Sequence, residues 1–73
     1  MKAFGRAIKI KRIEVGMTQE SLAAQALLAR SFVSGVERGS VKETIVSVWK
    51  LASALQCQPR ELWSITQNMI STD

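Results

Sequence analysis

The residues whose types and spacing could do chemistry lie in the stretch RSFVSGVERG. Arg30 and Ser34 are four residues apart, and Ser31 and Gly35 form a second pair with the same spacing. Residues four apart share one side of a helix. The guanidinium of Arg30 can donate two parallel hydrogen bonds to adjacent acceptors, such as O6 and N7 of guanine. The short neighbours would let that side approach another surface closely.

The same stretch must also have a buried side. Val33 and Val36 are three residues apart, as expected for the core-facing stripe of a helix. Gly35 lies between them, although glycine inside a helix costs about 1 kcal/mol relative to alanine. A helix that inserts into a DNA groove about 12 Å wide gains from a bare surface. The alternative is that Arg30 and the serines form an ordinary solvated face.

Composition excludes several function classes. The 73 residues correspond to one small domain, and Cys57 is the only cysteine, so no intrachain disulfide can form. There is no histidine or tyrosine and no paired carboxylate cluster, so we expect no metal, no cofactor, no small-molecule substrate and no enzyme activity. No signal peptide or membrane span is recognisable, which favours a cytoplasmic protein. Cys57 is expected to pack as a small hydrophobe.

The net charge of +4 is unevenly distributed. Residues 1–38 contain seven Lys or Arg and three Glu, whereas residues 39–73 contain three basic and three acidic residues. The first part of the chain is therefore basic and the second is balanced. This asymmetry indicates an anionic partner. The alternative is that the excess positive charge only keeps the protein soluble.

Apolar spacing predicts an all-α chain without strands. Residues 1–66 would form the folded domain, and residues 67–73 a frayed tail. Gly16 would end the first helix, Thr18 and Thr44 would cap the second and fourth, and Pro59 would open the fifth. The expected helices span about residues 4–14, 18–25, 29–37 and 45–55, with a fifth from residue 59. Their expected inward residues are Phe4, Ile8, Val15, Leu22, Ala23, Ala26, Ile45, Val48, Leu51, Ala52 and Leu55.

Two of these helices, joined by a tight break, form a helix-turn-helix over about residues 18–37. The order of residues resembles the phage repressor/Cro-type family, often called the XRE family. The resemblance covers nearly the whole chain and implies a five-helix, lambda-repressor-like DNA-binding domain. It is carried by Arg12, GMTQESLA at 16–23, RSFVSGVERG at 30–39, the apolar positions of 45–55, and PRELW at 59–63.

Together with the resemblance, the residues suggest roles for individual side chains. Phe32 could contact DNA or pack in the core, and Thr18 could contact phosphate or serve only as a cap. The resemblance implies that Gln19 contacts a phosphate and braces the recognition helix. It also implies a partly buried structural ion pair between Arg12 and Glu37. The expected base contacts are Ala29, Arg30, Ser31, Phe32, Ser34 and Gly35, and the expected phosphate contacts are Thr18, Gln19, Arg38 and Lys42.

Three positions depart from the family pattern. Leu27 stands where the turn usually has glycine, and a leucine with positive φ is strained. Ala29 stands at the cap of the recognition helix and cannot accept an amide hydrogen bond. Gln56 replaces the usual glycine after the fourth helix. The first two changes predict an altered turn, or a marginal fold that a partner subunit steadies.

The partner is expected to be a second copy, because two recognition helices would read half-sites about 34 Å apart. Its interface would involve Trp49, Trp63, Ile65 and Met69, although either tryptophan could belong to the core. The recognition segment particularly resembles restriction–modification controller proteins. The alternatives are a phage Cro-like repressor, an antitoxin that represses its own operon, and a protein-binding adaptor. If DNA is bound, Arg30→Ala should relax base preference, and Arg38→Ala should weaken all sequences alike.

Overall fold

The computed structural model describes the backbone of residues 2–71 and the side chains of residues 3–68. Within residues 2–71 it contains helices and no strand, which confirms the all-α prediction. None of these helices is long and apolar enough to cross a membrane. The helices are α1 (Lys2–Glu14), α2 (Gln19–Ala26), α3 (Arg30–Arg38), α4 (Ile45–Ala54) and α5 (Pro59–Ser71).

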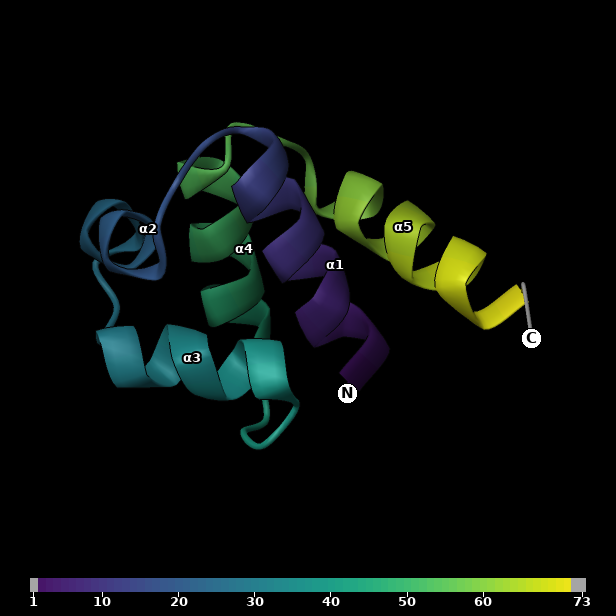
Figure 1. Ribbon diagram of the computed structural model, residues 1–73, viewed down its shortest axis with the longest axis horizontal. Coiled ribbons are helices and arrows are strands. Elements are labelled where there is room, and N and C mark those ends of the chain that lie inside the picture. Colours follow the sequence, from purple (N-terminus) through teal and green to yellow (C-terminus); the bar gives the residue numbers. More distant parts are fainter. Residues whose placement is uncertain (1, 72–73) are drawn as a thin grey trace.

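The helices are arranged so that α3 lies along one edge of the molecule (Figure 1). Helices α1 and α2 pack against its inner side, and α4 packs against α2. Helix α5 packs against α1 and α4, and its C-terminal half extends away from the other helices (Figure 1). One long side of α3 therefore stays uncovered while its other side is held by the domain.

The core is formed where these helices meet. Val33 and Val36 of α3 have no exposed surface, and Leu22, Ala23 and Ala26 of α2 are buried as predicted. Small alanines on α2 allow a close approach to its neighbours. The other buried apolar residues are Phe4, Ala7, Ile8, Leu51, Ala52, Leu55 and Leu62.

The helix ends follow the predicted caps. Gly16 takes a left-handed conformation after α1, with φ 79°. The Thr18 hydroxyl accepts the Ser21 amide at 3.0 Å, which caps α2. Thr44 caps α4 and forms a complete capping box with Ser47. Helix α5 begins at Pro59, where its missing N–H does no harm.

Several expectations were wrong. Helix α5 continues to Ser71, so the frayed tail expected over residues 67–73 is wrong as far as Ser71. Val15 is 44% exposed because it lies beyond the end of α1. Ile45 is 89% exposed because it begins α4, before the helix meets the core. Apolar spacing predicts which side of a helix faces the core, but it does not show where along the helix the core ends.

Candidate nucleic-acid interface

The outer side of α3 carries polar side chains that we call the reading face: Arg30, Ser31, Ser34 and Arg38. Arg30, Ser31 and Arg38 are exposed, and Ser34 is half-buried. The exposed Ala29 precedes them as the N-cap residue. The structure thus brings the expected arginine and serines to one side of a helix whose valines anchor it from behind.

Gly35 does not belong to this face, and its expected exposure was wrong. It is buried beneath the loop that follows α3. A Cβ built there would lie 2.9 Å from Cγ1 and 3.2 Å from Cγ2 of Val41, which is closer than side chains normally pack. The Ser40 hydroxyl also donates to the Gly35 carbonyl oxygen at 3.2 Å. Gly35 is therefore small so that Val41 can pack, and sequence spacing could not reveal this neighbour.

Phe32 is half-buried and packs against the core cluster. The sequence left core packing and DNA contact open for this side chain. The structure places part of the ring in the core and leaves part of it accessible. Phe32 thus contributes to anchoring α3 at the boundary of the reading face.

A buried polar network ties α3 to the first two helices. The Arg12 guanidinium donates to the Glu37 carboxylate from Nε at 2.8 Å and from Nη2 at 3.2 Å. Its Nη1 donates to the Met17 carbonyl oxygen at 2.9 Å. The Glu37 side chain is only 3% exposed, and that of Arg12 is 12% exposed. The ion pair that the resemblance implied is present, and its geometry satisfies both charges.

Gln19 joins this network from the start of α2. Its Nε2 donates to Glu37 Oε1 at 3.1 Å, so the side chain braces the C-terminal half of α3. The amide has further donor and acceptor capacity beyond this bond. Gln19 therefore links the first helix of the motif to the second.

Thr18 and Lys42 lie outside both the reading face and the network. Thr18 is exposed and caps α2, so its oxygen is engaged with the Ser21 amide. Lys42 is exposed in the loop between α3 and α4. The N-terminal amides of α2 carry partial positive charge, as those of any helix do. These groups can attract an anion but do not by themselves define a site.

The turn between α2 and α3 places Leu27 in the left-handed conformation that glycine usually adopts, and no alteration of the turn is apparent. Leu27 adopts φ 58° and ψ 42°, a left-handed conformation. The Leu28 amide donates to the Ala23 carbonyl at 2.9 Å, which closes a Schellman-type helix end. Ala29 makes no side-chain cap bond. The turn is closed by backbone hydrogen bonds even though its residue types are unfavourable.

An apolar surface lies apart from the reading face, around α4 and the start of α5. Ile45 is 89% exposed, Trp49 64% and Trp63 43%. They border an open cavity of ≈ 510 Å³ that we call the apolar groove. The residues lining it are Lys42, Glu43, Thr44, Ile45, Val48, Trp49, Pro59 and Trp63.

The sequence found only part of this surface. It named Trp49 and Trp63 but placed Ile45 in the core, and it did not single out Val46, which is 63% exposed. The Trp63 ring also contacts the Phe4 ring at a centroid distance of 5.1 Å, so Trp63 has both core and surface contacts. Ile65 is half-buried, and the Met69 side chain lies outside the described residues. The sequence did contain a signal. Ile45 and Val46 directly follow the Thr44 cap, and two adjacent apolar residues cannot both lie on one buried stripe of a helix.

The described residues offer little support for metal binding or for thiol chemistry. Among the described residues, no cluster of three His, Cys, Asp or Glu side chains could hold a metal ion. Burial raises the pKa of the Cys57 thiol above its usual value, and the nearby Glu61 carboxylate adds to this effect. Cys57 therefore favours the protonated form, which is a poor nucleophile.

Comparisons with known proteins agree with this geometry. A family model described as helix-turn-helix matches residues 8–62. The control protein C.BamHI from Bacillus amyloliquefaciens is 33% identical over 64 residues, covering 86% of this chain and 79% of that protein.

Solved structures show the same likeness. The restriction–modification controller protein C.AhdI from Aeromonas hydrophila is 44% identical, with a TM-score of 0.82 over 84% of this chain and 92% of that one. The controller protein C.Esp1396I gives a TM-score of 0.92 at 32% identity, over 99% of this chain and 94% of that one. The structure of C.Esp1396I bound to a 19 base pair DNA duplex gives a TM-score of 0.88 at 33% identity, over 94% of this chain and 92% of that one. This chain therefore belongs to the helix-turn-helix family, and within it to the restriction–modification controller proteins.

Proposed function

We propose that this protein is a sequence-specific regulator that binds double-stranded DNA as a homodimer on a palindromic operator. It would act in the cytoplasm, without a cofactor and without catalysis, on its own gene and on the endonuclease gene of a restriction–modification system. The observation that carries the proposal is the reading face, where polar donors point outward from a helix whose valines are fully buried. The DNA-bound structure of the relative C.Esp1396I supports the same use of this fold.

Base contact would come from the N-terminal half of α3, which in this motif enters the major groove. Arg30 is exposed at the first helical position, where its guanidinium can reach the edge of a guanine. Ala29 and Ser31 beside it are short and exposed, which permits a close approach. The accessible part of Phe32 would meet a thymine methyl or a sugar edge.

Phosphate contact would come from groups around α2 and the loop after α3. Gln19 is already held by Glu37, so little side-chain freedom would be lost when its remaining amide groups meet a phosphate. Thr18 accepts the Ser21 amide and keeps its hydroxyl proton to donate. Lys42 would add charge attraction from the loop.

Homodimerisation would bury the apolar groove. Contiguous exposed apolar surface on a small protein usually marks an interaction site. Trp49 and Trp63 are the residue type most enriched at interface hot spots, and Ile45 and Val46 extend the surface. A second copy fits because a palindromic operator requires a two-fold axis, and a two-fold interface is made from the same patch on both subunits. Ile65 and Met69 on α5 remain part of the proposed interface.

Binding to duplexes from a randomised library, and to the region upstream of the gene, tests this function. Wild-type protein should select a palindrome, and Arg30→Ala should reduce discrimination at one base position of each half-site by about 1–3 kcal/mol. Arg60→Ala is the matched control. Arg60 is an exposed arginine on α5, so this substitution removes the same positive charge at a site outside α3. Binding without preference by the wild type would contradict the proposal and favour a protein-binding adaptor.

A further inference from the structure

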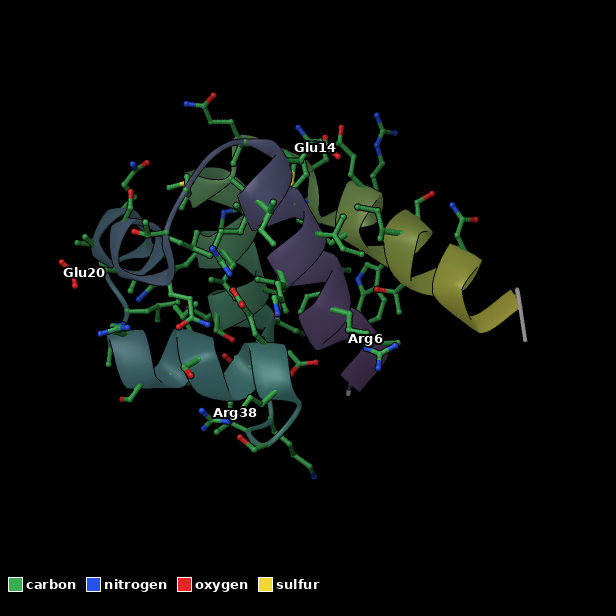
Figure 2. All side chains as sticks on the ribbon, viewed as in Figure 1. Arg6, Glu14, Glu20 and Arg38 are labelled. Atoms are coloured by element: carbon green, nitrogen blue, oxygen red, sulfur yellow. The ribbon has the colours of Figure 1, made fainter. Side chains whose placement is uncertain are left out.

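Arg38 takes an unexpected position on the reading face. Its Nη1 donates a hydrogen bond to the Ser34 hydroxyl oxygen at 2.8 Å. Side chains on a helix lean toward its N-terminus, so an arginine at the last position can reach back over the previous turn. Figure 2 shows Arg38 on the outer side of α3, turned away from α1 and α4. The guanidinium therefore lies along the middle of the recognition helix and not beyond its end.

Most of the hydrogen-bonding capacity of Arg38 stays available in this position. A guanidinium has five N–H donors, and the Ser34 contact uses one of them. The ion pairs within residues 3–68 join Lys11 to Glu14 and Arg12 to Glu37, so none of the carboxylates in this part of the chain pairs with Arg38. Arg12 differs, because its nitrogens bond to Glu37 and to the Met17 carbonyl. Arg38 is thus an oriented and exposed donor group.

We infer that Arg38 is a second specificity-determining residue that reads a base edge, and that Ser34 is its positioning residue. The inference rests on the proposed function, in which α3 enters the major groove. Arg30, Ser34 and Arg38 follow each other at intervals of four residues. The Arg38 guanidinium lies beside Ser34, and the four residues of helix from Arg30 to Ser34 rise by about 6 Å. The two guanidinium groups would therefore read different base pairs of one half-site, since successive pairs are about 3.4 Å apart.

The serine contact favours base reading over the phosphate contact expected from sequence. An arginine can also fork onto a phosphate, but phosphate oxygens accept hydrogen bonds from several directions and carry no sequence information. A base edge must be met by a planar fork in a defined orientation. The Ser34 hydroxyl fixes one nitrogen of the Arg38 guanidinium and so limits how the fork can turn. Ser34 keeps its own proton to donate to a neighbouring acceptor.

Randomised-duplex binding of full-length wild type, Arg30→Ala, Arg38→Ala, Arg38→Lys and Ser34→Ala tests the inference. Arg38→Ala should lose about tenfold discrimination at a position separate from the one that Arg30→Ala affects. Arg38→Lys, which keeps the charge, should lose the same preference because it lacks the fork. Ser34→Ala should weaken that same preference about threefold and leave the salt dependence of binding unchanged. Circular dichroism of each variant controls for folding.

Two results would overturn the inference while leaving the proposed function intact. In the first, Arg38→Ala weakens all sequences alike and lowers the slope of log affinity against log salt by about one, as loss of a phosphate contact does. In the second, Arg38→Lys retains the full preference. If the wild type itself shows no preference, the proposed function fails, and this inference fails with it.

Discussion

The reading face on α3 and the apolar groove beside α4 are both exposed, but they are built and supported differently. The reading face carries an arginine at each end with serines between them, and behind it lie two fully buried valines and the Arg12–Glu37–Gln19 network. The apolar groove carries tryptophan and isoleucine side chains, and the one ring contact within residues 3–68 joins Trp63 to Phe4.

This difference indicates different partners. A surface that reads DNA must hold a few donors in fixed positions, so its helix needs a rigid support from behind. A surface that associates by hydrophobic burial gains stability when it is covered, and it needs less support before the partner arrives. Changes behind the reading face should therefore alter folding, whereas changes in the apolar groove should alter association and leave the fold intact.

The largest effect is expected behind the reading face. Glu37→Ala should lower the free energy of unfolding by about 3–5 kcal/mol, because it leaves the mostly buried Arg12 guanidinium without its carboxylate. Urea denaturation monitored by circular dichroism measures the change.

Two variants control this prediction. Glu14→Ala removes a carboxylate from an exposed ion pair with Lys11 and should cost much less. The double variant Arg12→Met with Glu37→Leu should recover much of the loss, since it leaves no unpaired buried charge. Equal losses from Glu37→Ala and Glu14→Ala would show that the network does not support α3.

An intermediate effect is expected in the apolar groove. Trp49→Glu should weaken the proposed homodimer by about 2 kcal/mol or more, because a charge would replace an aromatic side chain of the proposed interface. Monomer stability should change little, since Trp49 is 64% exposed. Sedimentation at several protein concentrations measures the association. Ile13→Glu, at an exposed isoleucine on α1 outside the groove, is the matched control. A loss of association with Ile13→Glu alone would place the dimer interface on α1.

Sequence reasoning found the features that depend on local chemistry. The caps at Thr18 and Thr44 and the start of α5 at Pro59 follow from residue type and position. The buried stripe of Val33 and Val36 follows from helical spacing. The Arg12–Glu37 pair joins residues 25 positions apart, and only the family resemblance indicated it.

Features that depend on what covers a residue were missed. Gly35 lies under Val41, a neighbour that comes from the following loop. Ile45 has the spacing of a core residue but begins its helix outside the core. The contact between Arg38 and Ser34 depends on the rotamer of a long side chain, which spacing permits but does not determine. Helical periodicity gives the face of a residue, and only packing shows whether that face is covered.

The smallest effect concerns the turn that leads into the reading face. Leu27→Gly should raise the free energy of unfolding by about 1 kcal/mol. A left-handed non-glycine residue costs about 1–2 kcal/mol. Glycine removes this cost but loses more conformational entropy on folding, which offsets part of the gain. The Leu27 side chain is 83% exposed, so little packing is lost. Thermal unfolding should show a midpoint about 4–8 °C higher. Leu27→Ala is the control, because it removes the same exposed side chain and keeps the unfavourable φ of 58°. If both variants unfold at the same temperature, the left-handed leucine is not a source of strain in this turn.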